Sequence, residues 1–594
     1  MKVKVAKYIA DFLASHGIDT LFTVTGGGAM HLNDAFGHHP GLHCVYNHHE
    51  QASAIAAEGY TRLSGKLSAV CVTSGPGGTN AITGVLGGWL DSIPMFVISG
   101  QVKRETTVYA TPLPLRQLGD QEYNIVASVR PMTKYAEIVL NPEDIRYHLE
   151  KALYLALSGR PGPVWLDIPL DVQGASVEIE SLRGFNPDEE WEIKSKPQLS
   201  EATSAAIIQR LKSAERPVIF AGSAIRMSGS HDAFLKMLES LRIPVVTAWN
   251  AHDAIPDSHP LFCGRPGTVG TRGGNFVVQN ADLLLVLGCR LNIRQISYNY
   301  RDFAPGAYKI VVDIDPLELQ KPTISPDLPV NADVRDVIET LIDSGVQIDR
   351  PEWLDWCSAI NRRYPACLPE YAESEILNPY LFIDRFSRLL RDDDAVVCGN
   401  GSACVIGFQA FNIKEQTRLF SNSGCAAMGY GFPAAIGAAV SRSGKRTVCI
   451  DGDGSFQMNL QELQTVVYNQ LNLKIIYLNN NGYHSIRQTQ TNLFQPPLVG
   501  VCDGNGLSFP DAEKIAWAYG IPYIRVTKEA DIERLIEKME EDGPIFAEIV
   551  VDPSQNFAPK LSSKVQPDGR ITSPPLDDMF PFLPKEEYAA NHPF

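Results

Sequence analysis

The chain has 594 residues, of which 44% are hydrophobic and 20% charged, as in a folded protein with sizeable cores rather than a disordered one. At roughly 150 residues per domain, this length predicts about four domains, or three large ones. Lysine and arginine total 52 against 68 aspartate and glutamate, and this net charge of −16 argues against nucleic acid as a partner. Apolar runs are shorter than the ~18 residues of a membrane-spanning helix, and the eleven cysteines lack CxxC spacing. We therefore expect a cytoplasmic protein with no membrane partner, disulfide framework or zinc site.

The N-terminus is predicted to be an amphipathic helix rather than a signal peptide, because Val5, Tyr8, Ile9 and Phe12 recur at helical spacing. Short β-branched runs then follow along the chain, each leading into a glycine-containing turn and a helical stretch. They lie at 68–78, 217–223, 282–290, 309–315, 446–455 and 473–482. Runs that are apolar on both faces and alternate with helices predict parallel sheets covered by helices, in an α/β fold of repeated βαβ units.

Two polar, proline-containing stretches, at about 184–200 and 345–378, are predicted linkers. They divide the chain into blocks at 1–183, 200–345 and 378–555, followed by a proline-rich tail at 556–594. The tail is expected to pack over the body or lie on its surface. The first and third blocks share a plan, an apolar strand ending in a glycine-rich loop that opens a helix, as in GPGGTNAITG and GDGSFQMNLQELQ. Domain duplication and repeated use of a common α/β turn both explain this likeness.

The most informative segment begins with the strand at 447–450, which leads into Gly452, Asp453, Gly454 and Ser455. Glycines let the backbone approach a phosphate closely, and the start of the following helix supplies unpaired N–H groups. A carboxylate here would repel a bare phosphate. Asp453 is therefore predicted to hold a divalent cation that itself binds the phosphates.

A second strand at 475–478 is followed by Asn479, Asn480 and Asn481. One βαβ crossover brings the two strand ends together at the edge where α/β proteins bind ligands. Carboxylate, amide, turn-carbonyl and phosphate oxygens make a shell that suits Mg²⁺ or Ca²⁺. Either turn alone is more often free of ligand, but the pair at this spacing favours a metal site.

A GDG sequence followed about two dozen residues later by NN is the thiamine-diphosphate motif, and the chain resembles the acetolactate synthase branch of that enzyme family. The likeness includes residues 48–62, 72–84, 91–102, 162–173 and 426–438. The stretches 267–276 and 291–299 and the PDGR…FPFLP tail are similar to carboligases of unusual-sugar biosynthesis within the branch. The resemblance implies three doubly wound parallel-sheet domains: a pyrimidine-binding domain at 1–183, a central Rossmann-like domain at 200–345 and a diphosphate-binding domain at 378–555.

The resemblance assigns catalysis to Glu50 of NHHEQ. In the family this glutamate shares a proton with the cofactor's aminopyrimidine ring, which then takes the proton from the thiazolium carbon. Without the resemblance, Glu50 is an ordinary solvated residue at the start of a helix. The implied metal ligands are Asp453, Asn480 and the backbone carbonyl of Gly482. The implied cofactor-binding residues are Thr25, Gly26, Asn400, Gly401, Ser402, Met428, Gly452, Gly454 and Ser455.

Two features of the cofactor-binding set have alternatives. At Ser402 and Ala403 the sequence departs from the Gln-His pair usual in acetolactate synthases, which puts side-chain contacts at these positions in doubt. Met428 fits the bulky residue that supports the bent cofactor, although a methionine beside glycines is more often core filler.

On the substrate side, the resemblance implies Gly27 and Gly28, whose N–H groups could stabilise an oxyanion, together with His31, Gln121 and His484. A structural or solvated role is the more common one for an isolated loop histidine. The middle block either binds FAD, as in acetolactate synthases, or is an empty scaffold. The FAD candidates are Gly222, Ser223, Gly270, Thr271, Arg272, Arg290 and Asp313. The family's R-F-D-D-R stretch is Arg290–Arg294 here and lacks both acids, which weakens the flavin assignment.

These features predict a Mg²⁺- and thiamine-diphosphate-dependent enzyme that decarboxylates pyruvate, or a similar 2-oxo acid, and transfers the acyl unit to a carbonyl acceptor. The alternatives are a carboligase acting on a nucleotide-activated keto sugar and a non-ligating decarboxylase or C–C hydrolase. Because the family places Glu50 and the metal loop on different subunits, the active site is expected to require at least a homodimer.

Overall fold

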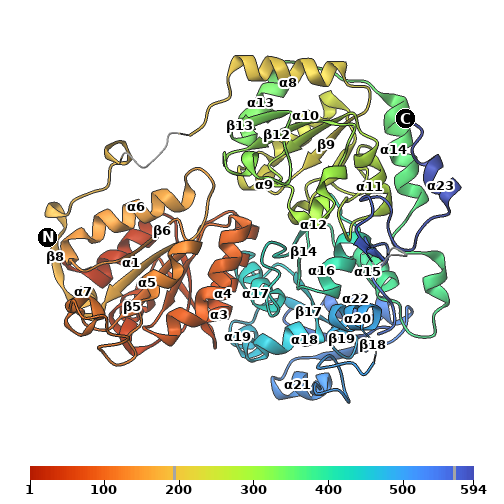
Figure 1. Ribbon diagram of the computed structural model, residues 1–594. Helices are drawn as coiled ribbons and strands as arrows, with labels where there is room; N and C mark the ends of the chain where they lie inside the picture. The colour runs from red at the N-terminus through yellow and green to blue at the C-terminus, as the bar shows by residue number, and fades with distance from the viewer. Residues whose placement is uncertain (191–195, 495, 566–569) are drawn as a thin grey trace.

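The computed structural model describes residues 1–190, 196–494, 496–565 and 570–594 (Figure 1). Part of the predicted linker at 184–200 and most of the PDGR sequence of the tail lie outside the described residues. Three parallel sheets, each covered by helices on both faces, form what we call the N-terminal, central and C-terminal units. This arrangement confirms the predicted α/β class with three doubly wound sheets. Where one domain ends and the next begins stays a prediction.

The N-terminal unit contains a six-stranded sheet in which every pairing is parallel. In spatial order its strands are β3 (His43–Tyr46), β2 (Thr20–Thr23), β4 (Ala69–Val72), β5 (Phe96–Gln101), β7 (Val164–Pro169) and β6 (Tyr135–Ile138). Its helices are α1 (Val5–Ser15), α2 (Met30–Gly37), α3 (Glu50–Ser64), α4 (Pro76–Asp91), α5 (Ile125–Val129), α6 (Ile145–Leu157) and α7 (Leu170–Gly174). Along β4, Ala69 and Cys71 face one core and Val70 and Val72 face the other, because side chains alternate across a strand.

The central unit has the strand order β10 (Val245–Thr247), β9 (Pro217–Ala221), β11 (Leu283–Leu287), β12 (Tyr308–Asp313) and β13 (Leu328–Asn331). Its helices are α8 (Glu201–Ser213), α9 (Ala224–Met227), α10 (His231–Leu241), α11 (Arg272–Gln279), α12 (Ile293–Ile296), α13 (Val334–Asp343) and α14 (Pro351–Arg363). The all-aliphatic strand β11 is buried throughout, as a central parallel strand must be.

The C-terminal unit has the strand order β15 (Arg418–Phe420), β14 (Ala395–Cys398), β16 (Thr447–Gly452), β17 (Leu473–Asn479), β19 (Ile545–Val550) and β18 (Tyr523–Val526). Its helices are α15 (Pro379–Leu389), α16 (Ser402–Ala410), α17 (Gly431–Ser441), α18 (Asp453–Phe456), α19 (Leu463–Tyr468), α20 (His484–Leu493), α21 (Ala512–Ala518) and α22 (Asp531–Met539). Numbered along the chain, the strands of this sheet and of the N-terminal sheet are both ordered 2-1-3-4-6-5. The shared order extends well beyond a common turn and favours duplication.

The two outer units meet where α3 lies against α17 (Figure 1). A Cβ at Gly59 would lie 2.3 Å from the Ala434 carbonyl oxygen, and one at Gly437 would lie 1.8 Å from the Ala56 carbonyl oxygen. Glycine is therefore required on both helices for this close approach. Beside it, buried Glu58 accepts a 2.7 Å hydrogen bond from the Tyr430 hydroxyl.

The described part of the tail packs first on the C-terminal unit, where the Ala558 N–H donates to the Tyr380 hydroxyl at 2.9 Å. It then lies against the central unit and includes α23 (Lys585–Ala590) (Figure 1). Asn275 Nδ2 donates to the Leu576 carbonyl at 2.8 Å, and Phe594 packs edge-on against Trp353 and Trp356. Two small antiparallel pairs complete the structure: β1 (Lys2–Lys4) with β8 (Ser176–Glu178), and β20 (Lys564–Val565) with β21 (Ile571–Thr572). No helix in the described ranges is long and apolar enough to cross a membrane. A cytoplasmic location stays a prediction.

Candidate functional site

The loops after β16 and β17 bring Asp453, Asn480 and Gly482 together. The two strands are parallel neighbours, with Gly452 opposite Leu478, so both loops leave the same edge of the sheet. The Gly482 N–H donates to Asp453 Oδ2 at 2.9 Å, and the Gly454 N–H donates to Oδ1 at 2.7 Å. The predicted proximity of these loops is therefore present in the structure.

The electrostatics at this point fit a cation. Asp453 is 2% exposed, and burial raises its pKa to about 6, although N–H groups of Gly482 and Gly454 oppose the rise. Asn480 Oδ1 is buried with no hydrogen-bond partner. A buried amide oxygen that accepts no hydrogen bond lies next to a buried carboxylate. Oxygens of these two kinds are ligands that a hard divalent ion prefers. Within the described residues no group of three His, Cys, Asp or Glu side chains is placed to hold a metal ion, so a cation here would need other oxygen ligands besides Asp453.

Two further loops of the C-terminal unit, at 400–401 and 426–429, lie against this position. Asn400 Nδ2 donates to the Ala426 carbonyl at 3.1 Å, and the Gly429 N–H donates to Ser455 Oγ at 2.9 Å. Gly401 has a φ of +65° before α16, where Ser402 is buried. These contacts gather the predicted cofactor-binding residues Asn400, Gly401, Ser402, Met428, Gly452, Gly454 and Ser455 at one edge of the sheet.

The two glycines of the GDG sequence differ in what surrounds them. A Cβ at Gly454 would lie 2.2 Å from the Tyr483 ring, whereas a Cβ at Gly452 would have no atom within 4 Å. Gly454 is required by packing inside the protein. The space at Gly452 is open, as expected for a backbone that a ligand approaches.

Sequence reasoning missed Asp451, which is fully buried beside this edge. A Cβ at Gly399 would lie 1.9 Å from Asp451 Oδ1, and a Cβ at Gly431 would lie 2.7 Å from Oδ2. Burial raises the pKa of Asp451 to about 7. The carboxyl group packs the loop after β14 against the start of α17. The glycines at positions 399 and 431 were the only sequence signal for this contact, and a glycine alone does not show which side chain packs against it.

Glu50 begins α3 and lies at the corresponding edge of the N-terminal sheet. Its Oε2 accepts a 3.0 Å hydrogen bond from Asn80 Nδ2, and a Cβ at Gly77 would lie 3.6 Å from Oε1. The neighbouring Gln51 accepts a 3.2 Å hydrogen bond from Asn459 of the C-terminal unit. Glu50 is therefore anchored within its own unit, next to a contact between units.

The predicted substrate-side residues of the N-terminal unit gather around the loop at 73–77. The Gly28 N–H donates to Thr73 Oγ1 at 3.0 Å, and a Cβ at Gly26 would lie 2.5 Å from Thr73. Gln121 has a φ of +60°, and its carbonyl oxygen would lie 2.3 Å from a Cβ at Gly75. Thr25, Gly26, Gly27 and Gly28 thus lie on one side of this loop and Gln121 on another.

Both predicted histidines have internal contacts. His31 Nδ1 lies 2.9 Å from Lys4 Nζ, and its ring lies beside Gly174, contacts that favour a structural role. His484 is 7% exposed, packs edge-on against Phe557 and has an Nδ1 without a hydrogen-bond partner. Burial lowers the pKa of His484 to about 4.

Comparison with known sequences identifies the family. Models of the thiamine pyrophosphate enzymes match the N-terminal TPP binding domain at residues 3–124, the central domain at 204–341 and the C-terminal TPP binding domain at 399–549. The chain is 31% identical over 570 residues to the acetolactate synthase isozyme 3 large subunit of Escherichia coli, covering 93% of this chain and 96% of that one. The probable acetolactate synthase large subunit of Methanocaldococcus jannaschii is 29% identical over 600 residues, covering 96% and 95%.

The chain belongs to the acetolactate synthase-like family of thiamine pyrophosphate enzymes. The resemblance in the sequence is thereby confirmed, and the protein is a thiamine-pyrophosphate-dependent enzyme. The two matches to TPP binding domains cover β2 to β5 of the N-terminal sheet and β15 to β18 with most of β19 of the C-terminal sheet.

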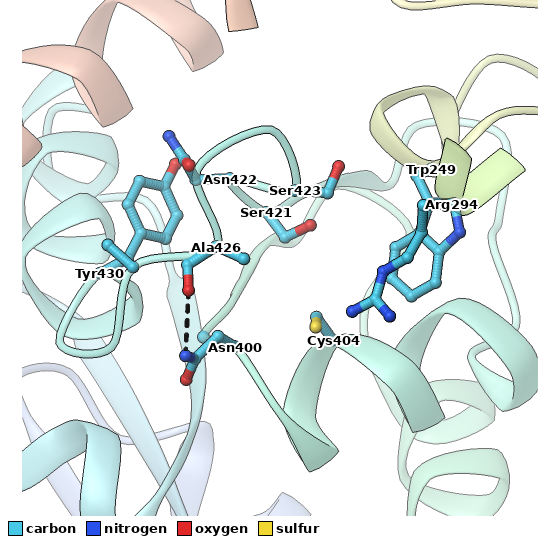
Figure 2. A pocket seen from close by; sticks show the side chains of 11 residues that line it. Trp249, Arg294, Asn400, Cys404, Ser421, Asn422, Ser423, Ala426 and Tyr430 are labelled. Atoms are coloured by element: carbon cyan, nitrogen blue, oxygen red, sulfur yellow. Dashed lines mark hydrogen bonds between the residues drawn. The ribbon is translucent and has the colours of Figure 1, made fainter. Parts of the chain in front are cut away.

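A small pocket lies between the central and C-terminal units of this thiamine pyrophosphate enzyme (Figure 2). Trp249 and Arg294 line it on one side; Asn400, Cys404, Ser421, Asn422, Ser423, Ala426 and Tyr430 line the other. The Arg294 guanidinium lies 5.4 Å from the centroid of the Trp249 ring and, among the described residues, has no carboxylate partner. Trp249 Nε1 and Ser421 Oγ are buried without hydrogen-bond partners. Sequence reasoning missed Trp249 and Ser421, which carry no motif.

A larger cavity of about 550 Å³ lies at the junction of all three units. Ser223, Arg290 and Asp313 line it, and burial raises the pKa of Asp313 to about 6. The remaining predicted FAD residues lie outside its lining. Gly222 packs against the Gly288 carbonyl, Gly270 against the Arg265 carbonyl, and Thr271 caps α11. Arg272 donates to the Met579 and Pro581 carbonyls of the tail at 3.3 and 2.6 Å. The structure therefore divides the predicted FAD residues into two groups. Three line the cavity, and four, including Arg272, make contacts elsewhere in the protein.

Proposed function

We propose that the enzyme decarboxylates pyruvate, or a similar 2-oxo acid, and transfers the resulting acyl unit to a carbonyl acceptor. The observation that carries this proposal is the buried cluster of Asp453, Asn480 and Gly482, with an amide oxygen that lacks a donor. The names of the relatives, acetolactate synthases, support pyruvate as the substrate.

In this proposal Asp453, Asn480 and the Gly482 carbonyl hold Mg²⁺, and Gly452, Gly454 and Ser455 lie along the diphosphate. When bound, thiamine diphosphate supplies a nucleophilic carbon and an electron sink for the loss of CO₂. The chain supplies the rest. The Glu50 carboxyl group holds a proton against the pyrimidine ring, and Asn80 orients that carboxyl group. The Gly28 N–H already donates to Thr73, so Gly27 is the better candidate for an oxyanion donor.

The proposed active site is shared between subunits. Within the described residues, the one hydrogen-bond partner of the Glu50 carboxylate is Asn80, in the same unit. The segment around Gln121 also exposes a set of large apolar side chains: Tyr109, Leu113, Leu115, Leu118 and Tyr123. An exposed apolar patch next to a candidate site supports burial against a second chain. We propose at least a homodimer, in which Glu50 of one subunit faces the metal loop of its partner.

The acceptor is proposed to bind in the pocket of Figure 2. The Arg294 guanidinium, 5.4 Å from the centroid of the Trp249 ring and without a carboxylate partner among the described residues, suits an anionic group. The pocket has a volume of about 10 Å³, enough for about one water molecule, so its walls must move apart to admit the carboxylate of a second 2-oxo acid or the phosphate of a nucleotide-activated keto sugar. In a plain decarboxylase or hydrolase this donor set would have no role in catalysis.

The cavity at the junction of the units is proposed as the flavin site. Its volume lies in the ordinary range for ligand pockets, and Arg290 has no ion-pair partner among the described residues. The divided residue set described above limits the assignment to Ser223, Arg290 and Asp313. The visible absorption spectrum of the purified enzyme tests it, because bound FAD is coloured.

The deciding experiment incubates the enzyme with pyruvate, Mg²⁺ and thiamine diphosphate, with and without a panel of aldehydes, ketones and nucleotide sugars. We expect CO₂ release and mass spectra of ligated products with one acceptor class. CO₂ release without any ligated product would establish the decarboxylase instead. No CO₂ release from any 2-oxo acid tested would overturn the proposed function.

A further inference from the structure

Arg487, in the second turn of α20, reaches back over the turn that precedes its own helix. Its Nη2 donates to the Asn480 carbonyl at 3.1 Å and also to the Asn481 carbonyl. Its Nη1 donates to the Pro553 carbonyl at 3.3 Å, in the segment that follows β19. One guanidinium therefore joins the turn after β17 to a second segment of chain at the same edge of the sheet.

The turn itself has an unusual backbone. Asn481 has a φ of +55° and Gly482 a φ of +132°, so two successive residues have positive φ angles, which side chains disfavour. A Cβ at Gly482 would lie 2.0 Å from the Val501 carbonyl oxygen and 2.9 Å from Arg487 Nη2. The position therefore requires glycine, and the guanidinium is part of the wall that imposes this requirement.

Arg487 is not held there by an ion pair. Across the described ranges no carboxylate lies within ion-pair distance of it, and its Nε is buried without a hydrogen-bond partner. Among the described residues, the hydrogen-bond acceptors of its side chain are all backbone carbonyls. A planar fork that reaches two segments at once is specific to arginine, since lysine offers a single point of donation.

We propose that Arg487 is a positioning residue for the divalent cation. By occupying the Asn480 and Asn481 carbonyls, it leaves the Gly482 carbonyl as the metal ligand of the turn and fixes the backbone that carries the Asn480 side chain. The inference rests on the metal site of the proposed function and adds to it the group that selects the ligand. Groups that orient metal ligands typically change metal affinity by about 10–100-fold when removed.

The test compares Arg487→Met and Arg487→Lys with a matched control, Arg350→Met. Arg350 also donates to three backbone carbonyls, those of Ala214, Asp349 and Lys212, but lies in the central unit. The full-length enzyme with thiamine diphosphate is titrated with Mn²⁺, and the EPR signal of free Mn²⁺ gives the dissociation constant without turnover. Thermal unfolding is measured on the same samples.

For Arg487→Met we expect an about 10–100-fold larger Mn²⁺ dissociation constant and a kcat near wild type at saturating metal. Arg487→Lys should fall between, because it keeps the charge but not the fork. Arg350→Met should lower the unfolding temperature and leave the Mn²⁺ constant unchanged. If Arg487→Met does not fold, Arg487→Lys alone tests the inference, and its Mn²⁺ dissociation constant is expected to be at least several-fold larger than that of the wild type.

An unchanged Mn²⁺ constant in a folded Arg487 variant would overturn the inference, as would an equal increase in Arg350→Met. Asp453→Ala separates this failure from failure of the proposed function. If Asp453→Ala loses Mn²⁺ while the Arg487 variants bind normally, only the role of Arg487 is wrong. If Asp453→Ala binds Mn²⁺ like wild type, the metal site is wrong and the inference falls with it.

Discussion

Replacing Glu50 with glutamine tests the proposed proton transfer with little structural change. The glutamine amide oxygen can accept the same 3.0 Å hydrogen bond from Asn80, and the side chain is only half-buried. We therefore expect the free energy of unfolding to change by less than about 0.5 kcal/mol. Turnover should fall by about 10²–10⁴-fold, the usual contribution of a positioned acid or base. Cofactor binding should persist, because the proposed anchor of the diphosphate lies in the other outer unit.

Steady-state CO₂ release, thiamine-diphosphate titration and thermal unfolding measure these three quantities. Glu58→Gln is the matched control on the same helix. Glu58 is 1% exposed and pairs with Arg62 and Tyr430, so its variant should lose up to about 3 kcal/mol of stability. Turnover per folded Glu58→Gln molecule should stay near wild type. Wild-type turnover in Glu50→Gln would refute the assignment of Glu50.

Three more predictions concern other parts of the chain. Asp453→Ala should purify without thiamine diphosphate, and normal cofactor content by mass spectrometry would contradict the metal assignment. Arg294→Met should raise the KM for an anionic acceptor about tenfold or more while CO₂ release from pyruvate alone persists, and an unchanged acceptor KM would contradict the pocket assignment. Burial, with Arg265 nearby, lowers the pKa of His252 to about 3, so the unfolded chain binds a proton below pH 6.5 that the folded chain does not. Its contribution to stability should therefore be about 2 kcal/mol smaller at pH 5 than at pH 7, and urea unfolding of His252→Phe should lack this part of the pH dependence.

The sequence predicted the sheets well because each strand carries its own local signal. Strand β11, for example, is a run of five buried aliphatic residues, and such runs alternate with helical patterns throughout. The approach of Asp453 to Asn480 was also predictable, since parallel strands joined by one crossover end at the same edge. Both inferences need only the chain order of neighbouring elements.

Contacts between distant segments were not predictable in this way. Arg272, in a glycine-rich turn, was a candidate FAD residue, but in the fold it binds the carbonyls of Met579 and Pro581. His31 was predicted to be a substrate-side residue because of the glycine-rich loop that precedes it, but its contact is Lys4 of the first strand, which the loop sequence does not indicate. The pocket at Trp249 and Ser421 joins segments more than 150 residues apart, and neither residue belongs to a motif. Such pairings depend on how the units pack, which periodicity and spacing do not encode.

The mutual fit of α3 and α17 has a consequence for how this protein can change over time. With Gly59 seated on one main chain and Gly437 on the other, neither helix has room to accept a larger residue alone. A substitution that enlarges a residue in one helix must be compensated by a substitution in the other. The two outer units are thus expected to change together over time, although their loops differ.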